Sequence, residues 1–256
     1  MPCEHHKFQL DRPASRRLRS LFRSWLLMLC CVLPLVGQTH PFSQGEQLVY
    51  TAGFRLFSVG TTTMEVMTPD SLSRDTALHI VSRVRTNPLF DRLYRIDDRV
   101  ELRLDPQSLE LRRMLRNINE GSYHRRDTAL VDPQAGLILA GKDTLTAEGP
   151  VFDPIGAIYY LRSQPLDRGT TFKLSIFDGR RLRPMAITVT GPVSIKVPAG
   201  EFDCLVLSPS PLDDQPTTKV GGFLKLWLAT DERRTPVRVE QRTNFGTMVL
   251  KLVEVR

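Results

Sequence analysis

Two ionisable side chains interrupt the apolar faces of two neighbouring predicted strands. In YRIDDRVELRLD (residues 94–105) every second residue from Tyr94 is apolar except Asp98. In the next predicted strand, Arg113 shares its row with Leu109, Leu111, Leu115 and Asn117. A buried charge without a partner costs several kcal/mol, so the pattern predicts an inward Asp98–Arg113 ion pair. In a different strand register, Arg116 or Arg83 would take the place of Arg113.

This pair allows two interpretations. It could form a polar spot inside a cavity and orient a ligand there. It could instead be a core salt bridge, or a bulge at Asp97–Asp98 could turn the carboxylate into solvent. The sequence leaves both interpretations open.

Residue types suited to catalysis do not form a recognisable constellation. After the first 38 residues only His40, His79 and His124 remain as histidines, and none stands at metal-ligand spacing. No Gly-x-Ser-x-Gly segment presents a nucleophile. Carboxylates such as Glu101 and Glu120 could pair for glycoside chemistry, but any β-protein this charged offers such pairs. We therefore predict no catalytic residue, no metal and no cofactor.

Arginines are concentrated on the charged faces of the same predicted strands. They are Arg92, Arg95, Arg99, Arg103, Arg112, Arg116, Arg125 and Arg126. Such a face could contact anionic lipid or polysaccharide head groups. The alternative is a solvated sheet face whose charges alternate with those of Asp97 and Glu101.

Alternation with a period of two continues through most of the chain after residue 45. Turn-forming segments such as Asp105–Ser108, Asn119–Gly121 and Asp178–Gly179 separate the apolar rows about every dozen residues. This pattern is typical of an antiparallel meander. We predict an all-β fold, either a barrel or a curved half-barrel.

One segment, residues 153–163, departs from this alternation. Asp153 can cap a helix, Pro154 suits its first turn, and apolar residues follow at helical spacing. The sequence predicts one short helix here, plugging or flanking the sheet.

The first 38 residues have the pattern of a signal peptide. A basic stretch (residues 16–23) precedes twelve mostly apolar residues (25–36), which are too few to span a bilayer. We predict cleavage near Gln38, export to the periplasm, a single β domain over residues 39–256, and no transmembrane span in the mature chain. The alternative is an uncleaved N-terminal anchor.

The net charge of +7 is no argument for nucleic acid as a partner. The predicted leader carries six basic and two acidic residues, a net of +4, so only +3 remains for the rest. A basic leader is expected of a targeting segment. We therefore predict that the protein does not bind nucleic acid.

Short motifs in a fixed order resemble the DUF3108 family of exported bacterial proteins. They are GEQLVY (45–50), RTN (85–87), NINEGSY (117–123), DPIGAIYYLR (153–162), FDG (177–179), VPAGEF (197–202) and LWL (226–228). The likeness covers nearly all of residues 45–256. It implies an envelope protein of mainly β structure and supplies no catalytic residue.

These observations together predict a non-enzymatic, exported envelope protein. Its ligand would be a lipid or another apolar or amphipathic molecule, or it would bind an envelope protein partner. The predicted ligand contacts are Asp98, Arg113, Arg85, Asn87 and Tyr159. An enzyme acting on envelope polysaccharide or lipid, and a structural interaction module that uses edge strands, remain alternatives.

Overall fold

One large β-sheet contains all fifteen strands of the computed structural model, which describes residues 40–54, 57–69, 76–212, 223–243 and 246–256. The predicted signal peptide and its cleavage point lie outside these residues. The strand order is β8-β7-β6-β5-β4-β3-β2-β1-β15-β14-β13-β12-β11-β10-β9. Nearly every strand therefore pairs with its neighbour in sequence, as a meander requires.

The strands have the following bounds. The first eight are β1 (Gln47–Phe54), β2 (Phe57–Val66), β3 (Leu78–Thr86), β4 (Asp97–Leu104), β5 (Leu111–Glu120), β6 (Tyr123–Asp132), β7 (Leu137–Ala140) and β8 (Asp143–Thr146). The others are β9 (Val151–Phe152), β10 (Thr171–Phe177), β11 (Leu182–Val197), β12 (Gly200–Pro211), β13 (Phe223–Ala229), β14 (Pro236–Thr243) and β15 (Gly246–Val255).

The sheet is curled but not closed. Strand β1 pairs with the last strand, β15, so the two ends of the described chain meet in the middle of the sheet. Strands β8 and β9 stand at its two edges. All neighbouring strands are antiparallel except β9, whose two residues run parallel to β10. The predicted all-β, curved half-barrel fold is confirmed.

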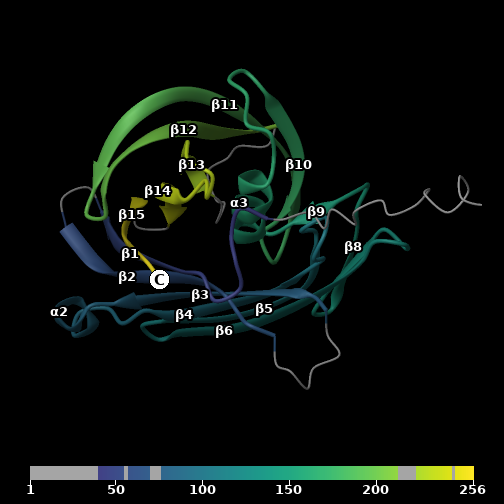
Figure 1. Ribbon diagram of the computed structural model, residues 1–256. Helices are drawn as coiled ribbons and strands as arrows, with labels where there is room; N and C mark the ends of the chain where they lie inside the picture. The colour runs from purple at the N-terminus through teal and green to yellow at the C-terminus, as the bar shows by residue number, and fades with distance from the viewer. Residues whose placement is uncertain (1–39, 55–56, 70–75, 213–222, 244–245) are drawn as a thin grey trace, which may run out of the picture. The chain divides into compact units, whose positions relative to one another are not determined.

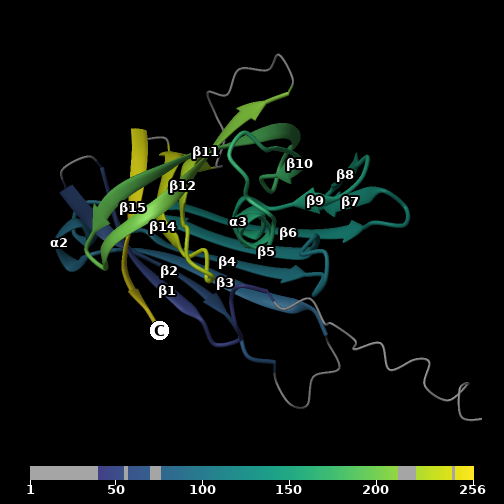
Figure 2. The same ribbon diagram turned by 45° about the horizontal axis from the view of Figure 1, so that its top comes forward.

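Helix α3 (Pro154–Arg162) occupies the inside of the curl, as Figures 1 and 2 show. The Asp153 carboxylate accepts hydrogen bonds from the backbone N–H groups of Ile155 (2.7 Å) and Gly156 (3.2 Å), so it caps the helix as its sequence predicted. In Figure 1 the arc of β11 and β12 passes on one side of α3, and β3 to β6 form the layer on the other.

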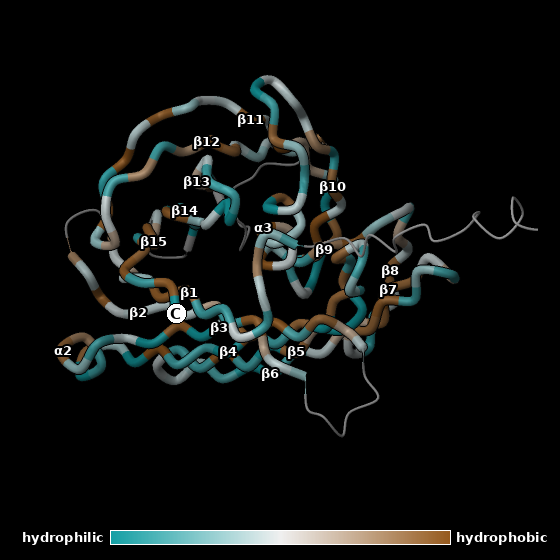
Figure 3. The backbone as a smooth tube through the Cα atoms, in the orientation of Figure 1, coloured by the Kyte–Doolittle hydropathy of each residue, from teal (hydrophilic) through white to brown (hydrophobic). Residues whose placement is uncertain are grey.

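Helix α3 joins the two parts of the hydrophobic core. Ala157, Ile158 and Leu161 pack with the inward residues of β1 and β10 to β15. Tyr159 packs with those of β3 to β7. Figure 3 shows apolar residues on α3 and on the strands that face it. The concave side of the sheet is therefore filled by protein side chains around this helix.

The structure also has a four-residue helix, α2 (Pro88–Asp91), which the sequence analysis did not predict. Asn87 begins it, with its side-chain oxygen accepting the N–H of Phe90 at 3.0 Å. Its amide nitrogen donates to the carbonyl of Ser58 at 3.1 Å, and its backbone N–H donates to Val59. These bonds attach α2 to the start of β2.

Candidate functional site

The predicted Asp98–Arg113 pair does not form, because the two side chains lie on opposite faces of the sheet. Asp98 belongs to the inward row of β4, which continues to the buried Leu102. On β5 a bulge intervenes: Leu104 pairs with Leu111 and Arg103 pairs with Arg113, so Arg112 is an extra residue. One extra residue reverses the faces of all that follow. Arg113 is thus exposed on the outer face.

Arg116, the alternative partner, lies on the inward row instead. It stands opposite Val100 of β4 and donates a hydrogen bond to the carbonyl of Asp178 in the β10–β11 turn. Asp98 itself accepts the backbone N–H of Asn119 at 2.8 Å. Burial, reinforced by the neighbouring Glu120 carboxylate, raises the pKa of Asp98 to about 6, against the opposing effects of the Asn119 N–H and Arg116.

This raised pKa leads to a test of Asp98. The folded state binds the proton more tightly than the unfolded chain, whose pKa is near 3.8, so stability falls as the pH rises from 3.8 to about 6. Asp98→Asn keeps an oxygen for the Asn119 N–H and removes the charge. We expect its melting temperature to exceed that of the wild type by about 2 °C or more near pH 7.5 and to match it near pH 4. Thermal unfolding measured across this pH range provides the check.

Asp97→Asn is the matched control. Asp97 is on the outer face and accepts a hydrogen bond from Arg85 at 3.1 Å, so its loss should produce no gain in stability near neutral pH. A destabilised Asp98→Asn variant near pH 7.5 would show that the carboxylate has a favourable partner, contrary to this account.

Two more of the predicted contact residues, Tyr159 and Asn87, have contacts that stabilise the fold. Tyr159 is fully buried in α3, with its ring edge-on to Phe42 at 5.0 Å between centroids. Burial raises the pKa of Tyr159 far above its usual value. Asn87 caps α2, as described above. The five predicted residues therefore do not converge, and among them Arg85 alone lines a cavity on the outer face of the sheet.

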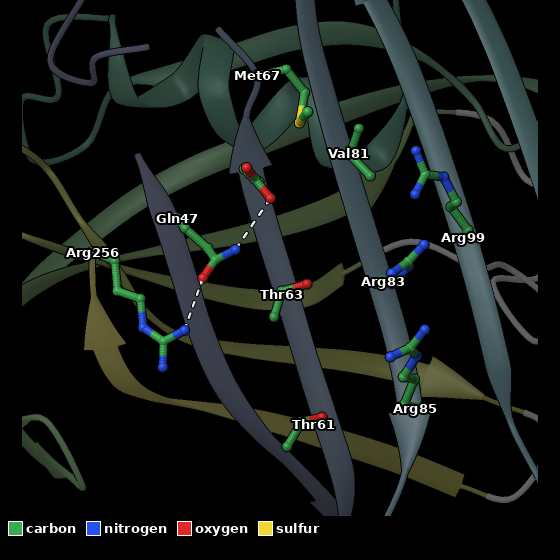
Figure 4. A pocket seen from close by; sticks show the side chains of 10 residues that line it. Gln47, Thr61, Thr63, Met67, Val81, Arg83, Arg85, Arg99 and Arg256 are labelled. Carbon is green, nitrogen blue, oxygen red and sulfur yellow. Dashed lines mark hydrogen bonds between the residues drawn. The ribbon is translucent and has the colours of Figure 1, made fainter. Parts of the chain in front are cut away.

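This cavity is a hollow of about 340 Å³ on the outer face of the sheet. It spans β1 to β4 and the C-terminal residue, and Figure 4 shows its lining. The lining residues are Gln47, Thr61, Thr63, Glu65, Met67, Val81, Arg83, Arg85, Arg99 and Arg256. Strand pairing explains this set, because Thr61 stands opposite Arg85, Thr63 opposite Arg83, and Arg83 opposite Arg99. We refer to it as the Arg83 hollow.

Most charges around the Arg83 hollow are already compensated. Arg85 contacts Asp97 at 3.1 Å, Arg99 contacts Glu101 at 2.8 Å, and Arg256 contacts Glu254 at 2.8 Å. The hydrogen bond from Arg99 also lowers the pKa of Glu101. At the polar end, Gln47 donates to Glu65 (3.1 Å) and accepts from Arg256 (3.3 Å).

Arg83 is the exception. Within the described ranges it has no hydrogen bond or ion pair, and its cross-strand neighbours are a hydroxyl, on Thr63, and a second guanidinium, on Arg99. Like charges directly opposite each other in a sheet repel. The half-buried Arg83 therefore presents an uncompensated positive charge to the hollow, and an anion placed there would reduce this repulsion.

Sequence reasoning missed Arg83, Arg99 and the threonines as members of one site. The alternation did place Arg83 and Arg85 on the face opposite Ser82 and Val84. A hydroxyl-bearing row, Thr61 and Thr63, in the preceding strand was the additional signal. Only the pairing register brings these two rows side by side, and Arg256 reaches them through the pairing of β15 with β1.

The described residues hold no group of three or more His, Cys, Asp or Glu side chains arranged to bind a metal ion. None of the helices in those same ranges combines the length and the apolar character needed to cross a bilayer.

Comparison with known proteins identifies the family. The family model described as "Protein of unknown function (DUF3108)" matches residues 49–253. The chain belongs to the DUF3108 family. This confirms the resemblance seen in the sequence motifs. Comparison with curated proteins gave no match.

This DUF3108 protein is similar to solved structures at low sequence identity. One is a β-barrel-like protein of the DUF1849 family from Brucella abortus, with 12% identity, a TM-score of 0.54, and coverage of 82% of this chain and 96% of that one. Another is a DUF1089 family protein from Pseudomonas aeruginosa, with 15% identity, a TM-score of 0.37, and coverage of 81% and 95%. The Brucella protein supports the β-barrel-like fold; likeness at this level carries no information about ligands.

Proposed function

We propose that this DUF3108 protein is an exported, non-enzymatic envelope protein that binds the anionic head group of an amphipathic molecule in the Arg83 hollow. The observation that carries the proposal is the half-buried Arg83, which lacks an anionic partner among the described residues. The basic leader with its twelve-residue apolar run supports export.

The size and lining of the hollow support a head group rather than a whole lipid. Its volume of about 340 Å³ is at the lower end for small-molecule sites. Thr61 and Thr63 offer hydroxyl groups, and Arg83 offers a planar fork of donors suited to phosphate or carboxylate oxygens. The buried Val81 and the thioether of Met67 provide a small apolar surface for the first carbons of a tail. We place the ligand on the outer face because side chains around α3 fill the concave side.

Binding of a soluble phospholipid tests this proposal. Short-chain phosphatidylglycerol, used below its micelle concentration, should bind the full chain more tightly than short-chain phosphatidylcholine. Arg83→Gln should weaken the phosphatidylglycerol complex about tenfold or more, because a hydrogen bond to a charged group contributes about 1.5–3 kcal/mol. Isothermal titration calorimetry at low and high salt provides the measurement.

Arg113→Gln is the control for that experiment, since Arg113 is exposed on the same face but does not line the hollow. It should leave the affinity within about twofold. Equal affinities of wild type and Arg83→Gln, or equal affinities for the two lipids, would refute an anion site at Arg83.

The enzyme alternative depends on different residues. Asp98, with its pKa near 6, lies beside Glu120, and glycoside hydrolysis uses one protonated and one ionised carboxyl group. Neither residue lines the Arg83 hollow. Hydrolysis of envelope polysaccharide that Asp98→Asn abolishes and Arg83→Gln does not would favour this alternative.

A further inference from the structure

The corner of the protein around α2 exposes large apolar side chains that no element of the described ranges covers. Leu89 is 71% exposed, Leu93 is 79% exposed, and Phe57 at the start of β2 is 69% exposed. Helix α2 has no buried residue, so it contributes little to the core. We call Phe57, Leu89 and Leu93 the apolar corner.

Hydrogen bonds hold the parts of the apolar corner together. Asn87 bonds to the carbonyls of Ser58 and Val59, directly after Phe57, while also capping α2. After the helix, the N–H groups of Leu93 and Tyr94 both donate to the carbonyl of Phe90. The chain at this corner is thus organised, and its three apolar side chains are directed to solvent by a defined backbone.

The corner projects from one end of the sheet. In both Figure 1 and Figure 2, α2 lies at one end of the layer that contains β3 and β4, far from α3. Figure 3 shows α2 as an apolar segment at that end. A convex apolar projection suits insertion into a fluid, flat surface, whereas a peptide or protein segment is normally bound in a groove.

Charge around the corner favours an anionic surface. Arg92 and Arg95 are both exposed and flank Leu93, and the one acidic residue of α2, Asp91, already accepts a hydrogen bond from Thr86 at 2.9 Å. Its distance to Arg95 is 4.0 Å, a weak and exposed contact. The basic outer face with Arg85 begins directly beyond Asn87. Basic residues next to inserted apolar side chains strengthen binding to anionic lipids.

We propose that the apolar corner docks the protein on the surface of a bilayer that contains anionic lipid, with Leu89, Leu93 and Phe57 inserted among the head groups. This is independent of the Arg83 hollow, because it needs a bilayer surface and different residues. It adds a peripheral attachment point to the domain.

Cosedimentation with vesicles tests the docking. The full chain should bind vesicles of mixed phosphatidylglycerol and phosphatidylcholine, and the double variant Leu89→Ser/Leu93→Ser should bind them at least tenfold more weakly. Arg92→Gln/Arg95→Gln should weaken binding to these vesicles several-fold and lose this effect in high salt. Since all variants carry the same N-terminal segment, differences between them report on the corner.

Leu130→Ser/Leu139→Ser is the matched control, since these leucines are 51% and 47% exposed but belong to β6 and β7. It should bind like the wild type. Exposed positions tolerate such changes, and unchanged melting temperatures would confirm that the variants fold. The proposal is overturned if Leu89→Ser/Leu93→Ser and Leu130→Ser/Leu139→Ser bind the vesicles alike. It is also overturned if Leu89→Ser/Leu93→Ser splits a dimer seen by light scattering, because a second copy would then cover the corner. Arg83→Gln should retain vesicle binding, which separates this result from that of the hollow.

Discussion

Replacing Arg162 with methionine is expected to lower the free energy of unfolding by about 3–5 kcal/mol. Arg162, in the last turn of α3, is fully buried. Its guanidinium contacts both carboxylate oxygens of Glu46, at 2.6 and 3.0 Å, and donates to the carbonyl of Arg233 at 3.1 Å. It also stacks over the Phe42 ring, with 5.0 Å to the centroid.

The large effect follows from what the variant leaves behind. Glu46 is 7% exposed, so without Arg162 its charge would remain buried and unpaired. Urea denaturation of the two single variants and of Glu46→Leu/Arg162→Met measures this coupling. The double variant should recover much of the loss, because two apolar side chains need no partner.

The Glu254–Arg256 pair is the control. Its atoms are 2.8 Å apart, but both side chains are about half exposed, so Glu254→Gln should leave the free energy of unfolding almost unchanged. A comparably small cost for Arg162→Met would mean that water reaches Glu46 when the arginine is removed, and the buried pair would then not anchor α3 to the start of β1.

Gly60→Ala is expected to destabilise the protein by about 3 kcal/mol or more. Gly60 of β2 pairs with Thr86 of β3. A Cβ at this position would overlap the backbone carbonyl of Arg85 and come within 3.1 Å of the Thr86 Cα. Backbone atoms of a paired strand cannot move aside as a flexible side chain can, so the strands would have to separate locally.

Gly156→Ala provides the comparison for Gly60→Ala. The Cβ added at Gly156 would lie 3.4 Å from Leu104 Cδ2, an ordinary contact, and alanine favours a helix by about 1 kcal/mol over glycine. This variant should be as stable as the wild type or slightly more so in the same urea titration. Equal losses in the free energy of unfolding at both positions would show that β2 and β3 are not closely packed at Gly60. Because Arg85 and Thr61 flank this point, Gly60→Ala should also weaken head-group binding in the Arg83 hollow.

The sequence alone determined the local features of this protein. The alternation in residues 94–104 predicted a strand with Asp98 facing inward, and the structure has β4 with Asp98 in the inward row. Asp153 and Pro154 predicted the start of α3, and the ordered motifs predicted the DUF3108 family. These predictions succeeded because side-chain period, helix capping and short motifs depend only on residues close together in the chain.

Only the tertiary structure decided which side chains meet. The extra residue Arg112 in β5 turned Arg113 outward and Arg116 inward, and alternation within one strand cannot reveal a bulge that exists only relative to its partner. Glu46 and Arg162 are 116 positions apart. The Arg83 hollow likewise requires the registers of β1 to β4 and the pairing of β15 with β1. Pairing register is set by contacts between strands that are distant in the sequence. The alternation within one strand therefore predicts which face of the sheet a charged side chain lies on. Whether that side chain has a partner depends on the folded sheet.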